Sequence, residues 1–222
     1  MKTVALKAVF PIQRADLEKA KGVEEMRLLI ELFQDRNHFP DKAIYQQSDS
    51  IIKAMLDEYW PLFVLMNQEF PDSLARLYSS SHPGPDAIIT HPDGSQTTIQ
   101  ITTCHRSRSE SLGRQLLAEG KPVWPARKRD GKKGNVRETG HAFTTREAQV
   151  AKVEREVTTA LAGKIANYRQ GTDALLIFGE MALVDERWKV RVKNSLEGTS
   201  GVPYRQIFVC DQRSVHISHL VK

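Results

Sequence analysis

The sequence has few of the features that define specialised protein classes. Only two of its 222 residues are cysteines, Cys104 and Cys210, too few for a disulfide framework or a zinc spacing. No apolar run approaches the roughly 20 residues that span a bilayer. Residues 1–7 lack the long apolar core and the small-residue cleavage site of a secretory leader. We therefore expect a cytoplasmic protein with reduced thiols and no membrane association.

The composition is that of an ordinary globular protein with a modest excess of positive charge. Hydrophobic residues make up 40% and charged residues 27% of the chain, which is close to the average for soluble domains. The net charge of +5 favours an acidic partner such as nucleic acid, although many proteins without such a partner share it. The length predicts one compact domain, with a helical region over residues 1–70 packed on an α/β core over 71–222.

Hydrophobic spacing predicts helices on either side of a central group of strands. Thr145 or Thr144, followed by Glu147, is typical of a helix N-terminus and predicts a long helix to about residue 169. Pro61 is expected to interrupt the chain, and the short apolar run after it is left unassigned. The other predicted elements are helices over 15–34, 50–59 and 186–196, a helix or strand over 74–78, and strands over 173–178, 206–210 and 214–217. This order predicts an α/β sheet flanked by helices.

The most informative stretch runs from residue 85 to residue 104 and predicts a β-hairpin. The sequence Pro-Asp-Gly at residues 92–94 is a strong turn signal, because proline presets the first turn angle and glycine accepts positive φ. Asp86 stands at the start of the first strand, and Gln100 and Thr102 alternate with apolar residues on the second. The hairpin is expected to place Asp86 and Gln100 side by side at one edge of a small sheet.

This hairpin resembles the central motif of the PD-(D/E)xK nuclease superfamily, which includes many restriction enzymes and DNA repair nucleases. Asp86, preceded by proline, matches the carboxylate of that motif. Where the family has an acidic residue, an apolar residue and lysine, this chain has Gln100, Ile101 and Thr102. The resemblance covers about residues 70–210 and implies a restriction-endonuclease-like fold, with a mixed central sheet flanked by helices.

The resemblance also implies a Mg²⁺ or Mn²⁺ site that supports hydrolysis of phosphodiester bonds in DNA. Its ligands would be Asp86, Gln100, the backbone carbonyl of Ile101, and an acidic residue of the first long helix, Glu25 or Glu24. Magnesium prefers hard oxygen ligands, and ligand charge helps to set affinity. Because glutamine carries no charge, we expect a weaker metal site than the family usually has.

The lysine missing from the motif has a candidate substitute on the long helix. Thr102 cannot orient a water or stabilise phosphate charge as a lysine does. Lys164 and Tyr168 lie four residues apart and so share one helix face. In some branches of the superfamily the lysine comes from a neighbouring element, and Lys164 is interpreted in this way. Gly163 is expected to let the helix approach the sheet closely.

Residues 105–145 are interpreted as an insertion that carries a basic stretch. Trp124 within this stretch adds an aromatic ring on which a base could stack. Positive charges near a sugar–phosphate backbone bind it by releasing counterions. The residues expected to clamp phosphates are Lys121, Arg127, Lys128, Arg129, Lys132 and Lys133. A solvated loop with no partner is the simpler interpretation of the same stretch.

Each of these residues also has an ordinary structural interpretation. Pro-Asp pairs recur at 40–41, 71–72 and 92–93, so the pair ending in Asp86 is weak evidence by itself. Two further hypotheses therefore stay open. One is a catalytically inactive protein of the same fold that binds nucleic acid or a protein partner, and the other is an α/β interaction domain with no nucleic-acid role. As a nucleic-acid partner, DNA is favoured over RNA. The sequence does not decide whether the protein forms a homodimer.

Overall fold

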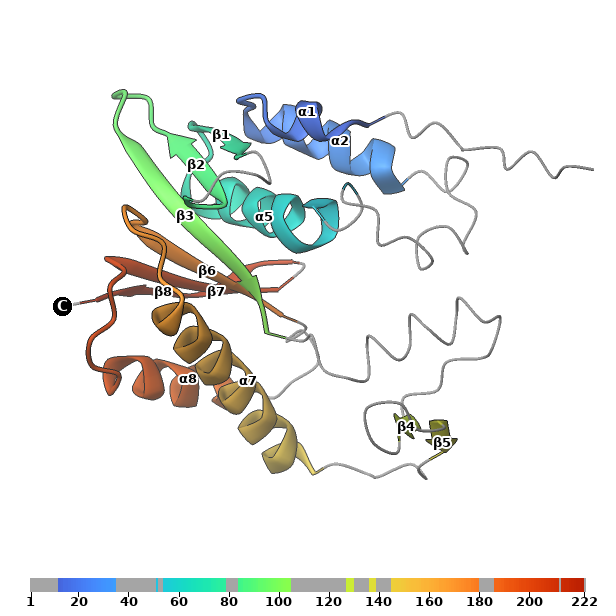
Figure 1. Ribbon diagram of the computed structural model, residues 1–222, viewed down its shortest axis with the longest axis vertical. Coiled ribbons are helices and arrows are strands. Elements are labelled where there is room, and N and C mark those ends of the chain that lie inside the picture. The colour runs from blue at the N-terminus through green and yellow to red at the C-terminus, as the bar shows by residue number, and fades with distance from the viewer. Residues whose placement is uncertain are drawn as a thin grey trace, which may run out of the picture.

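The computed structural model describes residues 12–34, 51, 54–78, 84–104, 127–129, 136–138, 145–179, 186–211 and 213–221. Its centre is one mixed six-stranded sheet that carries helices on both faces (Figure 1). The predicted α/β class is therefore confirmed. Within these ranges no helix is long and apolar enough to cross a membrane.

The sheet is parallel in the middle and antiparallel toward both edges. Its strand order is β1-β2-β3-β6-β7-β8, with parallel pairing of β3 to β6 and of β6 to β7. The outer pairs β1–β2, β2–β3 and β7–β8 are antiparallel. The strands are β1 (Leu74–Leu77), β2 (Ala87–Thr90), β3 (Gln96–Thr103), β6 (Ala174–Phe178), β7 (Gln206–Cys210) and β8 (Val215–Leu220). The segment over 74–78, predicted as helix or strand, is thus the edge strand β1.

Helices form a layer on each face of the sheet. The N-terminal elements α2, η1 and α5 pack on one face, and α7 and α8 pack on the other (Figure 1). The helices are α1 (Arg14–Leu17), α2 (Val23–Gln34), the π-helical turn η1 (Met55–Tyr59), α5 (Trp60–Glu69), α7 (Arg146–Ala166) and α8 (Arg187–Glu197). A separate pair of short strands is formed by β4 (Arg127–Arg129) and β5 (Val136–Glu138).

The central strand β6 explains the uninterrupted apolar run in its sequence. Ala174 and Leu176 belong to the core beneath the N-terminal helices, whereas Leu175 and Ile177 belong to the core beneath α7 and α8. Successive side chains of a strand point to opposite faces. Because both faces of β6 are covered by helices, every position must be apolar.

The predicted hairpin is present, and its turn has the expected chemistry. Gly94 has a φ of 83°, which glycine adopts without steric cost. The carboxylate of Asp93 accepts hydrogen bonds from the backbone N–H and the hydroxyl of Ser95, at 2.9 and 2.7 Å. The turn fixes the register in which Ala87 pairs with Ile99.

Candidate functional site

The register of the hairpin places Asp86 level with Gln100. Ala87 pairs with Ile99, so the preceding residue Asp86 stands beside Gln100. Ala87 lies in the core under the N-terminal helices, and alternation therefore directs Asp86 to the opposite face. Gln100 is level with Leu175 of β6, which lies in the core under α7. Both side chains accordingly face the layer of α7 and α8, as does Thr102, which is level with Ile177.

Helix α7 brings Lys164 onto this face of the sheet. Its N-terminus is capped by the hydroxyl of Thr145, which accepts a hydrogen bond from the backbone N–H of Ala148 at 3.1 Å. Its buried residues recur every three or four positions and are Val150, Val153, Val157 and Leu161. Lys164 and Tyr168 continue the same stripe. The Lys164 side chain is accordingly only 20% exposed.

Gly163 does not have the expected role. It lies on the exposed side of α7, and a Cβ added there would meet nothing within 4 Å. The prediction that this glycine allows a close approach of helix and sheet is wrong. The helix periodicity explains the error, because Gly163 is two residues beyond the buried Leu161 and so lies away from the sheet.

The carboxylate of Asp86 is held by three groups. Oδ2 accepts a 2.8 Å hydrogen bond from the backbone N–H of Ile101. Oδ1 accepts a hydrogen bond from the guanidinium of Arg169, and the ammonium of Lys164 lies 3.9 Å from Oδ2. The Asp86 side chain is only 15% exposed. A largely buried negative charge is thus bracketed by two positive charges, as buried charges require.

Asp86 also shares a sheet edge with the carbonyl of Ile101. The backbone N–H of Asp86 donates to the carbonyl of Ile99. The edge of β3 to which this carbonyl points therefore faces the start of β2. The N–H and C=O of one strand residue point to the same side of the strand. Because the N–H of Ile101 reaches Asp86, its carbonyl oxygen faces the same edge. The structure thus places two of the predicted oxygen donors next to each other.

Gln100 is part of a hydrogen-bonded pair in the interior. It is 1% exposed, and its Oε1 accepts a 2.6 Å hydrogen bond from the hydroxyl of Tyr204. The same hydroxyl lies 3.2 Å from the backbone carbonyl of Lys164. Burial raises the pKa of Tyr204 to about 12, so the phenol is a neutral donor at physiological pH. The side chain of Gln100 is therefore tied to the protein interior.

Tyr168 supports this pair but turns its hydroxyl away from Asp86. Its ring meets the Tyr204 ring edge to face, with 5.3 Å between centroids. Its hydroxyl donates to the backbone carbonyl of Thr172 at 3.0 Å. In the structure, the Tyr168 ring packs against Tyr204, and the Tyr168 hydroxyl stabilises the turn at Thr172.

Further charges surround Lys164. Burial lowers the pKa of Lys164, Arg169 lowers it further, and Asp86 and Glu58 act in the opposite direction. Glu58, on η1, lies 3.3 Å from Arg14, whose guanidinium also donates to the backbone carbonyl of Tyr78 at 2.9 Å. Segments far apart in the chain therefore bring acidic and basic groups to one end of the sheet.

The structure places Glu25 in a different local setting. Glu25 is exposed in the first turn of α2, and its carboxylate accepts a 3.1 Å hydrogen bond from the backbone N–H of Gly22. Its neighbour Glu24 pairs with Arg27 at 2.6 Å. Among the described residues, no contact joins either glutamate to Asp86. Sequence reasoning missed Glu58 of η1, whose charge raises the pKa of Lys164.

Two other site residues were missed, Arg169 and Tyr204. Arg169 lies three residues after the end of α7 and five residues after Lys164. No helix rule predicts that side chains at this spacing converge, so the sequence carries no signal for Arg169. Tyr204 precedes β7 in an irregular segment, and its contact with Gln100 spans 104 residues. A contact of that range is set by tertiary packing and leaves no local signal in the sequence.

The basic stretch lies mostly beyond what the structure describes. Lys121, Lys132 and Lys133 fall outside the described residues. Arg127, Lys128 and Arg129 form β4, which pairs with β5 in an antiparallel ribbon. Their predicted role as phosphate clamps stays a prediction.

The oxygen atoms that a hard divalent ion would meet at this site are few. The described residues contain no group of three or more His, Cys, Asp or Glu side chains placed to hold a metal. Magnesium is nevertheless commonly bound by one or two carboxylates, with water and substrate phosphates completing its shell. Asp86 supplies one carboxylate, and the Ile101 carbonyl faces the same edge. The positive charges of Lys164 and Arg169 oppose the binding of any cation here.

The fold and site define an α/β protein with a charged cluster at one end of a mixed six-stranded sheet. Comparison of the chain with family models, curated proteins and solved structures finds no match. The nuclease resemblance therefore depends on the motif residues and on the topology that surrounds them.

Proposed function

We propose that this protein is a metal-dependent nuclease that hydrolyses phosphodiester bonds in DNA, on a restriction-endonuclease-like fold. The observation that carries the proposal is the 3.9 Å approach of the Lys164 ammonium to the Asp86 carboxylate. Thr102 stands where the family has its lysine, and α7 supplies a lysine to the neighbouring space instead. The sequence alone predicts Lys164 for this role, so its approach to Asp86 supports the proposed site.

The roles of the residues follow from their chemistry. Asp86 and the carbonyl of Ile101 would hold Mg²⁺ or Mn²⁺, which when bound polarises a phosphate and lowers the pKa of an attacking water. The charge of Lys164 stabilises negative charge that develops on the phosphate oxygens. Because burial lowers the pKa of Lys164, its ammonium gives up its proton more readily than that of a solvated lysine does, and the neutral amine can then act as a general base.

A second candidate function is that of a non-catalytic binding protein, and the Gln100 contact favours it. The amide oxygen of Gln100 is occupied by the Tyr204 hydroxyl and is shielded from solvent. A site with one carboxylate, a neutral amide and two flanking cations attracts a phosphate more readily than a dication. Such a protein would bind nucleic acid or a protein partner without cleaving it.

Cleavage assays distinguish these functions. The wild-type protein and an Asp86→Ala variant are incubated with single-stranded DNA, double-stranded DNA and RNA in Mg²⁺ or Mn²⁺. The matched control is Asp72→Ala, which removes an exposed aspartate that also follows a proline. We expect Asp72→Ala to cleave at the wild-type rate and Asp86→Ala to be about a hundredfold slower or worse. Wild-type cleavage no faster than that of Asp86→Ala on every substrate would exclude catalysis at this site.

The binding function predicts a different pattern. DNA would bind with an affinity that falls steeply with salt, because phosphate contacts release counterions. Lys164→Gln would weaken this binding without any change in cleavage. Absence of salt-dependent DNA binding would exclude a DNA-binding role and favour a protein-interaction domain.

A further inference from the structure

We infer that the outer edge of β8 pairs in antiparallel register with the β8 edge of a second copy of this chain. Strand β8 lies three strands away from β3, which carries Gln100, so the inference does not depend on the proposed function. Among the described residues, β8 ends the sheet, with β7 on one side and no strand on the other. An unpaired sheet edge presents backbone N–H and C=O groups to which another strand can bind.

The two edges of the sheet differ in how they are protected. Proteins protect sheet edges with short strands, charged side chains, proline, or a covering segment of chain. Strand β1 is four residues long and contains Arg76, and its Ala75 exchanges two 2.9 Å backbone hydrogen bonds with Lys21. Strand β8 is six residues long and contains neither a charged residue nor proline. Within the described ranges, the chain thus covers the β1 edge itself and leaves the β8 edge open to pairing.

The hydrogen bonds to β7 identify which backbone groups of β8 face outward. The N–H of Val221 donates to the carbonyl of Arg205 at 3.0 Å, so the backbone groups of Val221 point toward β7. In an antiparallel pair, alternate residues of a strand bond to the same neighbour. The backbone groups of His219 therefore also point toward β7. Those of Ser218 and Leu220 point away from it and are available to a further strand.

A second copy of β8 satisfies these outward groups in one register. Ser218 of each copy stands opposite Leu220 of the other, and the two His219 residues face each other at a two-fold axis. A shift of two residues in either direction places one outward residue opposite the strand end or opposite the irregular pairing near Cys210. Because β8 carries no charge, the pairing brings no like charges together. The contact uses the same surface on both copies, as two-fold dimers do.

Exposed apolar surface at this edge also favours a partner strand. Leu220 is 69% exposed, the largest value for any large hydrophobic side chain among the described residues. On the same face of the sheet, the hydroxyl of Ser218 accepts a 3.0 Å hydrogen bond from the side-chain amide of Gln206. In the paired arrangement, Leu220 lies beside Ser218 of the second copy and diagonally next to its Leu220. Burial of the two leucines then adds to the backbone hydrogen bonds between the strands.

Sedimentation equilibrium of the full chain tests this inference. We expect the wild type to form a reversible dimer with a dissociation constant of about 1–100 µM, because the contact is short. Leu220→Lys places two positive charges next to each other at the edge and should weaken the dimer about tenfold or more. The matched control is Leu74→Lys, which changes an exposed leucine of the opposite edge strand β1 and should leave the dissociation constant unchanged.

A cysteine at the two-fold axis tests the register. Directly opposite residues of a pair without mutual hydrogen bonds have Cα atoms about 4.5 Å apart, a distance that a disulfide can bridge. In a Cys104→Ser background, which leaves only the buried Cys210, His219→Cys should form a disulfide-linked dimer under mild oxidation. Val190→Cys, at an exposed position of α8, is the control and should cross-link at least about tenfold more slowly.

Three results would overturn the inference. The first is a wild type that stays monomeric up to about 500 µM, which would leave the edge to an extended segment of another protein. The second is an equal effect of Leu220→Lys and Leu74→Lys, which would place the dimer contact elsewhere. The third is cross-linking of His219→Cys no faster than that of Val190→Cys, which would exclude the proposed pairing of the two strands.

Discussion

The hydroxyl of Tyr204 donates a 2.6 Å hydrogen bond to the side-chain oxygen of Gln100, and the pair lies between the sheet and the end of α7. In the resemblance to PD-(D/E)xK nucleases, Gln100 takes the position of the second carboxylate. The contact shows that the neutral amide is integrated into the interior by a specific partner. It also joins the segment before β7 to the strand that carries the motif.

Removal of the Tyr204 hydroxyl should therefore destabilise the protein. Tyr204→Phe leaves a buried amide oxygen without its donor, which typically costs about 1–3 kcal/mol of unfolding free energy. Tyr168→Phe is the comparison, because the Tyr168 side chain is half-buried and its hydroxyl bonds the backbone carbonyl of Thr172. Urea unfolding at pH 7 should show the larger loss for Tyr204→Phe. Equal losses would mean that burial of Gln100 adds nothing to the strength of its hydrogen bond.

Restoring the family motif tests whether the native site is weakened. In the double variant Gln100→Glu, Thr102→Lys, a second carboxylate stands level with Asp86 and raises the affinity for Mg²⁺. We expect cleavage to become faster than that of the wild type by about tenfold or more at low Mg²⁺ concentration. Cleavage by the double variant alone would instead identify the native chain as the inactive binding protein.

The sheet and hairpin were predictable because local chemistry and tertiary structure agree there. The Pro-Asp-Gly turn, the alternation around Gln100 and the apolar run of β6 each carry a short-range signal. Helix α5 was missed because Pro61 was interpreted as a break. Proline is tolerated in the first turn of a helix, where its missing N–H would have no intrahelical partner.

The candidate site was predictable only in part. Asp86 and Lys164 follow from the motif and from helix periodicity, since Lys164 continues the stripe of Val157 and Leu161. Arg169 contacts Asp86 from a turn, and the charge of Glu58 acts on Lys164 from a π-helical segment. No periodicity describes the geometry of either segment. Tertiary packing decides which polar side chains from distant parts of the chain meet, and no short stretch of sequence predicts it.

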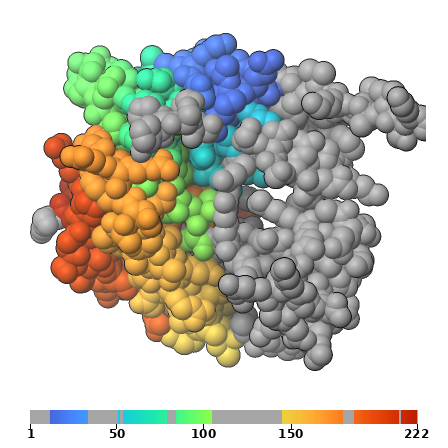
Figure 2. All heavy atoms as spheres, in the orientation of Figure 1, coloured from blue at the N-terminus to red at the C-terminus, as the bar shows by residue number. Residues whose placement is uncertain are grey.

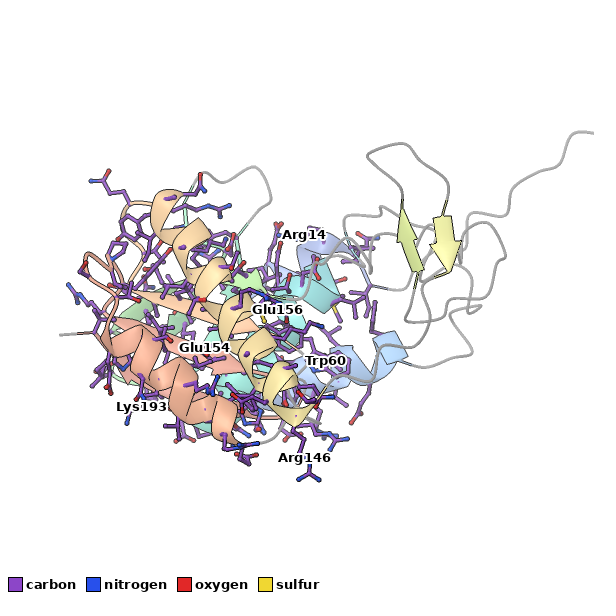
Figure 3. The ribbon with its side chains drawn as sticks, turned by 90° about the horizontal axis from the view of Figure 1, so that it is seen from below. Arg14, Trp60, Arg146, Glu154, Glu156 and Lys193 are labelled. Carbon is purple, nitrogen blue, oxygen red and sulfur yellow. The ribbon has the colours of Figure 1, made fainter. Side chains whose placement is uncertain are left out.

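Helix packing holds α7, and with it Lys164, in place. Arg191 of α8 contacts Glu147 of α7 and lies 3.7 Å from Glu154. Figure 3 shows the two helices side by side, with Glu154 labelled on α7 and Lys193 labelled on α8. In the space-filling view, the start of α7 lies at the opposite end of the viewed face from the N-terminal helices α1 and α2 (Figure 2). The end of α7 that carries Lys164 is thus the part that reaches the charged cluster.

Lys164→Gln should lower DNA cleavage while leaving the fold intact. The substitution removes the positive charge beside Asp86 but keeps a similar side-chain length, and loss of one such group typically slows hydrolysis about a hundredfold or more. The control is Lys152→Gln, which removes an exposed lysine of the same helix that pairs with Glu156 at 3.6 Å. Rates are compared at saturating Mg²⁺. Similar rates for the two variants would remove Lys164 from the mechanism.

Stability should depend on pH through Asp211, in the turn between β7 and β8. This side chain is almost fully buried, and Nε2 of His216 lies 2.8 Å from its Oδ2. The backbone N–H groups of Arg213 and Ser214 donate to Oδ1 at 2.8 and 3.1 Å. Burial works against ionisation, but the His216 contact and the two backbone donors outweigh it and lower the pKa of Asp211 below 3.8.

A carboxyl group whose folded pKa is depressed stabilises the fold at pH values above its unfolded pKa, and this stabilisation is lost as the pH falls through the folded pKa. Asp211→Asn should therefore cost about 1–3 kcal/mol of unfolding free energy at pH 7. The difference from wild type should shrink as the pH falls from about 3.8 through the lower folded pKa, where the folded wild-type carboxyl also becomes neutral. Urea unfolding at pH 7, 5 and 3 measures it, with the exposed Asp72→Asn as control. A difference that stays constant over this range would mean that the shape of the turn, and not the charge of Asp211, stabilises the junction of β7 and β8.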